Sequence, residues 1–350
     1  MRRTILCFLL ALLSPLPAAA TGTVEHHVRT FASLQNSGGE NPERSISVYL
    51  PTGYATSDEP LPVVYFLPGF GSTDRELMQQ LQPILDAEMD SGRVQPMIVV
   101  VPDHTTLYRG SYFANSSLTG NWIDYTARDV VDFVQERYRT LDARESRALV
   151  GWSSGAYGAL KIGMLHPEVF AHVYSMSPGI LTFTEDFGPQ GSGFTRAPQI
   201  ESREHLVDGW DELYANLVVA MGRAFSPNPD HPPFYADLPF VPGDQGMETN
   251  EGVLRLWERN APLHMLDEYE DNLRELDSLG LEWGRNDDFP NVIDGCRKFS
   301  AELERRGIEH RAQEYLGTHF DRIFEPDGRV ATQLLPFLDR RLERAGSSGT

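Results

Sequence analysis

The stretch RALVGWSSGAYGALKIGMLHP, residues 147–167, decides the fold. It begins as a short apolar run, passes through Gly-Trp-Ser-Ser-Gly, and continues as an apolar segment that favours a helix. The Gly-x-Ser-x-Gly pattern is centred on Ser153 and is typical of a nucleophile on a sharp turn between a buried strand and a helix. Glycine suits the flanking positions because a side chain there collides with neighbouring backbone. The pattern predicts Ser153 as a nucleophile, and a plain Gly/Ser turn is the alternative.

The rest of the chain repeats the order strand then helix. Seven apolar runs have strand length, and they cover residues 45–51, 61–69, 96–103, 147–153, 172–179, 279–287 and 309–317. Five segments have helical periodicity, namely Asp74–Met89, Ile123–Tyr138, Ala156–Leu165, Val292–Arg306 and Val330–Glu343. Runs rich in valine and isoleucine, without alternation, are typical of parallel strands covered on both faces. We therefore expect an α/β fold with a mostly parallel central sheet and helices on both faces.

The interval from about residue 179 to residue 271 breaks this rhythm. It holds the Gly-rich GPQGSGF, the Pro-rich SPNPDHPPFYADLPFVPGD, and two expected helices over Asp211–Phe225 and Val253–Tyr269. We expect an insertion over the carboxyl edge of the sheet that serves as a lid or a substrate wall. The alternative is an inserted surface segment that has no functional role.

The N-terminal residues 1–20 have the pattern of a secretory signal peptide. A basic start at Arg2 and Arg3 precedes an apolar run, and Ala18, Ala19 and Ala20 offer a small-residue cleavage site. The run is too short to anchor the mature chain in a bilayer, and a buried N-terminal helix is the alternative. We expect a secreted or periplasmic protein with one domain over 21–343, a disordered tail over 344–350 and no membrane anchor after cleavage.

The net charge limits the classes of molecule that the protein can bind, and the cysteine content limits its disulfides. The chain has 350 residues with a formal net charge of −20, so nucleic acid and anionic membranes are poor partners. Cleavage of the signal peptide leaves Cys296 alone, which excludes an internal disulfide. Lys161 and Lys298 are the two lysines of the sequence. No set of histidines has the spacing of a metal site, and we expect neither a metal nor a cofactor.

A serine nucleophile needs a base and a carboxylate that orients the base. In α/β-hydrolases these partners follow in the order serine, acid, histidine. The segment LEWGRNDDFP (281–290) ends a strand with Asp287 and Asp288, and YLGTHFDRIF (315–324) places His319 after the next strand. The sequence thus predicts His319 as the base, while its chemistry leaves both aspartates open as the acid. A surface-loop histidine and a solvated Asp-Asp turn are the alternatives.

Two backbone N–H groups are candidates to hold the oxyanion. The N–H of Ser154 follows the nucleophile at the start of a helix, whose dipole favours negative charge. A second donor is expected after an early strand, where FLPGFGSTD (66–74) lets the backbone approach closely around Phe70. We assign the second donor to the Phe70 N–H, and a tight turn without that role is the alternative.

These segments resemble the esterase D-like family of α/β-hydrolases, which includes S-formylglutathione hydrolases, feruloyl and acetyl esterases, and mycolyltransferases. The likeness runs from about Val28 to Leu338 and includes SISVYLPTGY (45–54), LPVVYFLPGFGS (61–72) and RALVGWSSGAYGALKIGMLHPEVF (147–170). The resemblance implies an α/β-hydrolase fold with a lid-like insertion. It departs from the usual pattern at Pro68, where many relatives have His, and at Ser154, where many have Met.

The resemblance also implies roles for individual residues. It matches Ser153 to the nucleophile, His319 to the base, and the backbone N–H groups of Phe70 and Ser154 to the oxyanion donors. It favours Asp287 as the acid, because the family places this residue three positions after the glycine that corresponds to Gly284.

The resulting hypothesis is an exported serine esterase that cleaves a small-molecule or polysaccharide-linked ester through an acyl-enzyme on Ser153. An acyltransferase with the same triad, and a non-catalytic carbohydrate-binding homologue, are the alternatives. In FANSSLTGNWIDY (113–125), Trp122 and Tyr125 are expected to stack on a flat acyl or sugar group, and packing beneath a loop is the other interpretation of Trp122.

Overall fold

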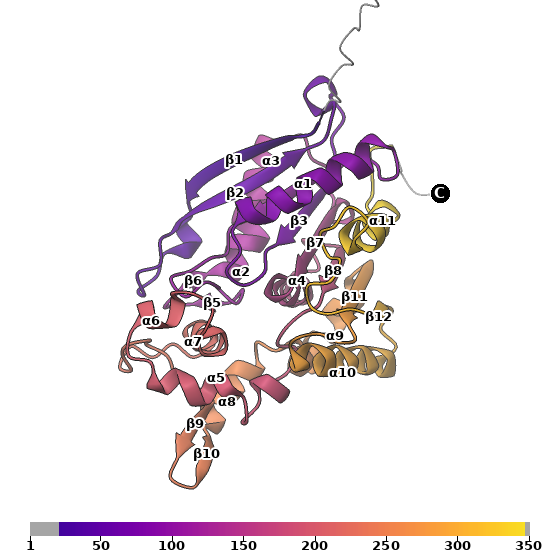
Figure 1. The fold of residues 1–350 in the computed structure, drawn as a ribbon. Coiled ribbons are helices and arrows are strands. Elements are labelled where there is room, and N and C mark those ends of the chain that lie inside the picture. The colour runs from indigo at the N-terminus through magenta and orange to yellow at the C-terminus, as the bar shows by residue number, and fades with distance from the viewer. Residues whose placement is uncertain (1–20, 347–350) are drawn as a thin grey trace, which may run out of the picture.

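A computed structural model describes residues 21–346, so the predicted signal peptide and the end of the predicted tail lie outside the described residues. An eight-stranded sheet runs through the molecule in the order β1-β2-β4-β3-β7-β8-β11-β12 (Figure 1). Its strands are β1 (Thr23–Thr30), β2 (Glu43–Leu50), β3 (Val63–Leu67), β4 (Ile98–Pro102), β7 (Arg147–Trp152), β8 (His172–Met176), β11 (Ser278–Gly284) and β12 (Arg311–Tyr315). Strand β2 pairs antiparallel with β1 and β4, and the remaining pairs are parallel. The predicted α/β fold with a mostly parallel sheet is confirmed.

Helices cover both faces of this sheet. Successive residues of a strand point to opposite sides, so each face presents apolar side chains to a layer of helices. Val64 and Phe66 of β3 pack with α1 (Asp74–Asp90) and α11 (Leu335–Asp339). Val63 and Tyr65 pack with the other face, under α3 (Val130–Arg137) and α4 (Ser154–Leu165). A further apolar cluster joins α4 to α10 (Pro290–Arg306). Within residues 21–346, none of the helices combines the length and the apolar character that crossing a membrane requires.

Several boundaries differ from the sequence prediction. Strand β1 was not predicted, because an edge strand with the sequence TVEHHVRT is largely exposed and has no apolar run. The expected helix over Ile123–Tyr138 forms as α2 (Trp122–Asp124), a π turn and α3. The helix expected over Val330–Glu343 forms as a π turn and α11, which ends at Asp339. Strands β5 (Asn115–Ser116) and β6 (Gly120–Asn121) form a small ladder of their own.

Most of the interval 179–271 forms a lobe beside the sheet (Figure 1). The lobe contains α5 (Ser192–Arg196), α6 (Arg203–Val207), α7 (Leu213–Phe225), the hairpin β9 (Phe240–Gly243) and β10 (Gly246–Thr249), and α8 (Glu251–Glu258), whereas α9 (Pro262–Glu275) packs against α4 and α10. The single helix predicted over Val253–Tyr269 is wrong, because α8 ends at Glu258 and α9 begins at Pro262. Proline lacks the backbone N–H that a continuous helix needs, and it is favoured at the first position of a new one.

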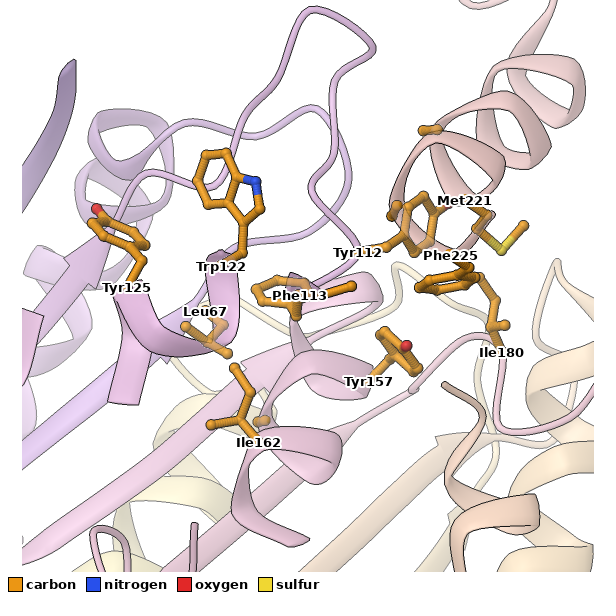
Figure 2. Packing of buried hydrophobic residues seen from close by; sticks show 14 of the residues in the cluster. Leu67, Tyr112, Phe113, Trp122, Tyr125, Tyr157, Ile162, Ile180, Met221 and Phe225 are labelled. Atoms are coloured by element: carbon orange, nitrogen blue, oxygen red, sulfur yellow. The ribbon is translucent and has the colours of Figure 1, made fainter. Parts of the chain in front are cut away.

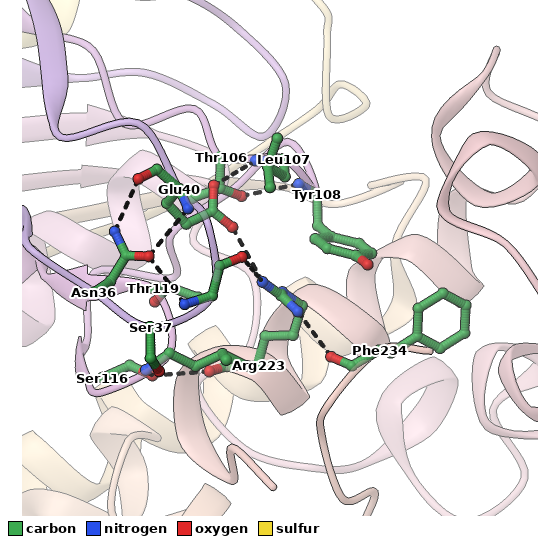
Figure 3. A network of polar contacts seen from close by, with 12 residues as sticks. Asn36, Ser37, Glu40, Thr106, Leu107, Tyr108, Ser116, Thr119, Arg223 and Phe234 are labelled. Carbon is green, nitrogen blue, oxygen red and sulfur yellow. Dashed lines mark hydrogen bonds and ion pairs between the residues drawn. The ribbon is translucent and has the colours of Figure 1, made fainter. Parts of the chain in front are cut away.

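Helix α7 is joined to the N-terminal part of the chain by a buried ion pair (Figure 3). Arg223 Nη2 lies 3.3 Å from Glu40 Oε1, and the two side chains are 3% and 1% exposed. The Leu107 N–H donates to the second Glu40 oxygen at 2.7 Å, and Arg223 Nη1 donates to the Phe234 carbonyl at 2.8 Å. The guanidinium also lies 4.2 Å from the centre of the Tyr108 ring. This network fixes one end of the lobe to the sheet domain.

A second buried cation lies between α4 and the lobe. The ammonium of Lys161 donates to Asn260 Oδ1 at 2.6 Å and lies 5.6 Å and 5.3 Å from the rings of Tyr157 and Phe225. These two rings belong to the aromatic core in Figure 2. Among the described residues, Lys161 forms no ion pair with a carboxylate. Burial lowers the pKa of Lys161 to about 7.

This lysine is expected to make stability depend on pH. The unfolded chain holds a proton on Lys161 up to its ordinary pKa of 10.5, whereas the folded protein releases it near pH 7. Between these values the unfolded state binds more protons, so stability rises with pH. Relative to Lys161→Met, the wild-type free energy of unfolding should rise by roughly 2–4 kcal/mol between pH 6 and pH 10. Urea unfolding of both proteins measures their free energies of unfolding at each pH. If the difference between the two proteins does not change with pH, the lowered pKa of Lys161 is contradicted.

Candidate active site

Ser153 occupies the sharp turn between β7 and α4. Its backbone has φ 58° and ψ −124°, a strained conformation that is frequent at functional sites. A Cβ on Gly151 would lie 2.2 Å from the Gly155 carbonyl oxygen, and a Cβ on Gly155 would lie 2.1 Å from the Leu67 carbonyl oxygen. Only glycine fits either position, which explains the Gly-x-Ser-x-Gly spacing.

The structure brings His319 between Ser153 and Asp287. His319 Nδ1 lies 3.0 and 2.9 Å from the two carboxylate oxygens of Asp287, and His319 Nε2 lies 2.9 Å from Ser153 Oγ. A carboxylate only accepts hydrogen bonds, so Nδ1 carries the hydrogen of the neutral ring and donates it to Asp287. Nε2 is then free to accept the hydroxyl hydrogen of Ser153. This arrangement is the one that general-base activation of a serine requires.

The two neighbouring aspartates have different positions. The Asp287 side chain is fully buried against the imidazole ring. Asp288 accepts instead from the backbone N–H of His319, at 3.3 Å. The chemistry of an Asp-Asp pair could not separate these roles, whereas the structure puts Asp287 at the ring nitrogen and Asp288 at the main chain.

Aromatic side chains surround the imidazole of His319, which is 2% exposed. The ring centres of Phe289, Phe320 and Trp152 lie 4.9, 5.1 and 5.4 Å from that of the imidazole. Trp152 Nε1–H also donates to the His319 carbonyl at 3.2 Å. These contacts exclude water and hold the ring in the orientation that serves both Asp287 and Ser153.

The two expected oxyanion donors lie beside the nucleophile. Phe70 and Ser154 both line the cavity that contains Ser153. Among the described residues, neither of their backbone N–H groups has an acceptor within the protein. The first N–H groups of a helix have no partner inside it, which applies to Ser154. The turn around Phe70 is closed on both sides, because Ser72 N–H donates to Gly69 and Gly71 N–H donates to Arg109.

A cavity of about 340 Å³ opens next to Ser153, and its walls are mostly apolar. The apolar and aromatic residues of its wall are Phe70, Tyr112, Trp152, Ile180, Phe187, Trp210, Leu213, Leu217, Phe289, Val292 and Phe320. The side chain of Asn291 also faces it, but its amide donates to Asp186 at 3.0 Å and its oxygen accepts from the Ile180 N–H at 3.0 Å. The cavity therefore offers an apolar group a good fit and offers few polar partners beyond the triad and the two N–H groups.

Part of this wall comes from the lobe, where sequence patterns named no individual residue. Phe187, Trp210, Leu213 and Leu217 lie within the interval 179–271. The sequence predicted a lid or a substrate wall here only because the interval does not follow the repeated order of strand then helix. The apolar positions 213 and 217, one helical turn apart on α7, were the available signal. They did not reveal which face of the helix meets the cavity.

The structure contradicts the expectation for Trp122 and Tyr125. Both side chains are fully buried, and neither lines the cavity beside Ser153. Their ring centres lie 5.7 Å apart, within the packed side chains of the core (Figure 2). Trp122 Nε1–H donates to the Thr119 carbonyl at 2.8 Å, so its polar atom is already satisfied. Both rings therefore belong to the core and form no part of the cavity wall.

Comparison with known proteins identifies the family of this chain. Residues 37–327 match the family model described as "Putative esterase". Esterase Rv1288 of Mycobacterium tuberculosis (strain ATCC 25618 / H37Rv) is 26% identical over 303 residues, which are 83% of this chain and 54% of that protein. The chain thus spans about half the length of the curated relatives it matches.

Solved structures extend the comparison to the fold. A ferulic acid esterase superimposes with a TM-score of 0.64 at 18% identity, over 92% of this chain and 99% of its own. An S-formylglutathione hydrolase from Agrobacterium tumefaciens gives a TM-score of 0.56 at 15% identity, over 93% and 97% of the two chains. At these identities the likeness concerns the fold. The match over residues 37–327 shows that the chain belongs to the family described as "Putative esterase", and its fold is that of an α/β-hydrolase.

Proposed function

We propose that this protein is an exported esterase that cleaves carboxylic esters through an acyl-enzyme on Ser153. The observation that carries the proposal is the continuous path from Asp287 through His319 to Ser153 Oγ, beside an apolar cavity. Export is supported by the signal-peptide pattern of residues 1–20. N-terminal sequencing of protein recovered from outside the cytoplasm tests it, and the expected mature chain begins near Thr21.

The first half of the reaction forms the acyl-enzyme. Ser153 Oγ attacks the ester carbonyl carbon while its proton moves to His319 Nε2. The carbonyl oxygen takes up negative charge and accepts from the N–H groups of Phe70 and Ser154. The tetrahedral intermediate collapses, the ester C–O bond breaks, and the alcohol leaves with the proton from His319. Asp287 stabilises the imidazolium that exists between these steps.

The second half returns the enzyme to its starting state. A water gives a proton to His319 Nε2 and attacks the acyl carbon, and the carboxylic acid leaves as Ser153 regains its hydrogen. An alcohol that replaces this water would make the same site an acyltransferase. Product analysis with and without added alcohol separates the two activities. A non-catalytic carbohydrate-binding role would instead give no turnover of any ester.

The cavity supports an apolar group on the substrate. Its volume of about 340 Å³ lies at the lower end of the range of roughly 300–1,000 Å³ that is usual for small-molecule sites. The polar atoms of Asn291 are already paired, so hydroxyl-rich groups would lose their hydrogen bonds with water there. A medium-length aliphatic group, or an aromatic group of the kind in the name of the similar ferulic acid esterase, meets these requirements.

Ester series test this assignment. With p-nitrophenol as the alcohol, kcat/KM is expected to rise from acetate to octanoate by roughly a hundredfold, because each buried methylene contributes binding energy. A second series with a constant acetyl group and longer alcohols shows which side of the ester occupies the cavity. A preference for the shortest acyl group in the first series, together with a preference for the shortest alcohol in the second, would contradict the apolar substrate class.

A further inference from the structure

Arg109 connects the nucleophile's surroundings to the lobe. It lies in the loop after β4, and its backbone has φ 72°, in the left-handed region. Its carbonyl accepts from the Gly71 N–H at 3.2 Å, directly after Phe70. The next residue, Gly110, supports the Phe70 ring, because a Cβ there would lie 2.5 Å from it. The main chain at 109–110 therefore holds the turn of residues 69–72, which we call the oxyanion turn.

The side chain of Arg109 reaches in the other direction, to the segment between α6 and α7. Its Nη2 donates to the Val207 carbonyl and, at 2.7 Å, to the Gly209 carbonyl. The guanidinium also lies 4.0 Å from the centre of the Trp210 ring. Among the described residues Arg109 has no carboxylate in ion-pair distance, so carbonyls and this ring are its partners.

Trp210 is the point where these contacts meet the substrate cavity. Its side chain lines the cavity although the residue is 57% exposed, which places it at the mouth. It also packs on the oxyanion turn, because a Cβ on Gly71 would lie 2.8 Å from the Trp210 ring. An exposed ring needs a partner to stay in one orientation, and a planar guanidinium against its face supplies one.

We propose that Arg109 is a positioning residue that fixes Trp210 over the cavity mouth and so determines the preference for esters with a large apolar group. The proposal rests on the function proposed above. A group that fills the cavity packs under Trp210, whereas an acetyl group next to Ser153 does not reach it. Arg109 thereby adds to the binding of large esters without touching the reacting atoms.

A double-mutant cycle with Arg109→Leu and Trp210→Ala tests this role. Leucine keeps the backbone carbonyl that holds Gly71, and it has the same left-handed strain as arginine. For p-nitrophenyl octanoate, Arg109→Leu is expected to lower kcat/KM about tenfold or more, mainly through KM, because it removes charge-assisted hydrogen bonds. The preference for octanoate over acetate should fall by the same factor. The double variant should lose little more than either single one, because both act through Trp210.

Two further variants serve as controls for Arg109→Leu. Arg203→Leu, on α6 in the same lobe, removes an arginine paired with Glu204 and should leave the preference unchanged. Arg109→Lys keeps the charge but loses the two-carbonyl contact, and it serves if Arg109→Leu does not fold. Equal losses on both esters, or additive effects in the cycle, would overturn the coupling. Reaction of wild type with a fluorophosphonate tests the proposed function separately, so failure of the one is distinguishable from failure of the other.

Discussion

Replacing Ser153 with alanine is expected to lower kcat by about 10⁴- to 10⁶-fold on any ester that the wild type hydrolyses. The reason is the hydrogen bond of 2.9 Å between Ser153 Oγ and His319 Nε2, which is lost together with the nucleophile itself. The remaining N–H groups and the cavity still bind substrate, so KM should change far less than kcat. Steady-state assays with p-nitrophenyl esters measure both constants.

The matched control for this variant is the neighbouring serine. Ser154→Ala keeps the backbone N–H that is assigned to the oxyanion, so its loss should stay below about tenfold. His319→Ala alone and in combination with Ser153→Ala should cost about as much as Ser153→Ala, because residues that act as a unit are not additive. A larger effect at Ser154 than at Ser153 would show that the nucleophile was assigned to the wrong serine.

Removing the buried partner of Glu40 is expected to have the largest effect on stability. Arg223→Met should lower the free energy of unfolding by about 3–5 kcal/mol, because it leaves a carboxylate without its cation in a dry interior. Burial already raises the pKa of Glu40, with the Leu107 N–H and Arg223 acting against that shift. Urea unfolding at constant pH measures the loss.

Two further variants separate the ion pair from general damage to the core. The double variant Glu40→Gln with Arg223→Met removes both charges and should recover part of the loss. Arg128→Met removes an arginine whose side chain is 58% exposed, and it should cost less than about 1 kcal/mol. A cost below 1 kcal/mol for Arg223→Met, or a double variant that costs the sum of both singles, would contradict a buried pair that anchors α7.

This anchor affects how the lobe is understood. The interval 179–271 was expected to be a lid or a substrate wall. Helix α7 carries both Arg223, fixed to Glu40, and the cavity residues Leu213 and Leu217. A helix held at one end by a buried network forms a stable wall at the other.

Much of the sheet could be predicted because most of its strands are buried and have apolar runs that few other elements share, although β2 is antiparallel and β12 is only partly buried. The seven predicted runs correspond to β2, β3, β4, β7, β8, β11 and β12. Strand β1 was not predicted because it lies at the exposed edge of the sheet. Hydrogen bonds to β2 define this strand, and burial does not. The break between α8 and α9 was missed although Pro262 stood at the junction.

The residues around the nucleophile could be predicted where chemistry constrains them or where the family resemblance matches them. Ser153 and His319 follow from a strained turn and the order of the triad, and both are where that order requires. The chemistry of two adjacent aspartates left Asp287 and Asp288 open, and the family resemblance favoured Asp287. The structure places Asp287 at the ring nitrogen of His319, a position that depends on how one loop packs. Trp122 and Tyr125 were predicted to stack on a flat group of the substrate, but both side chains are fully buried. Aromatic side chains pack in cores as readily as they bind ligands, so the sequence could not distinguish the two roles.

Covalent labelling by a fluorophosphonate tests the assignment of the nucleophile, with the labelled site measured by intact mass and peptide mapping on folded protein. Activation of Ser153 by His319 predicts a single adduct on Ser153 in the wild type and in Ser154→Ala, and none in Ser153→Ala. Because the reagent needs an activated serine, no adduct on folded wild type would contradict catalysis by the path from Asp287 through His319. An adduct that persists in Ser153→Ala would contradict the assignment of the nucleophile.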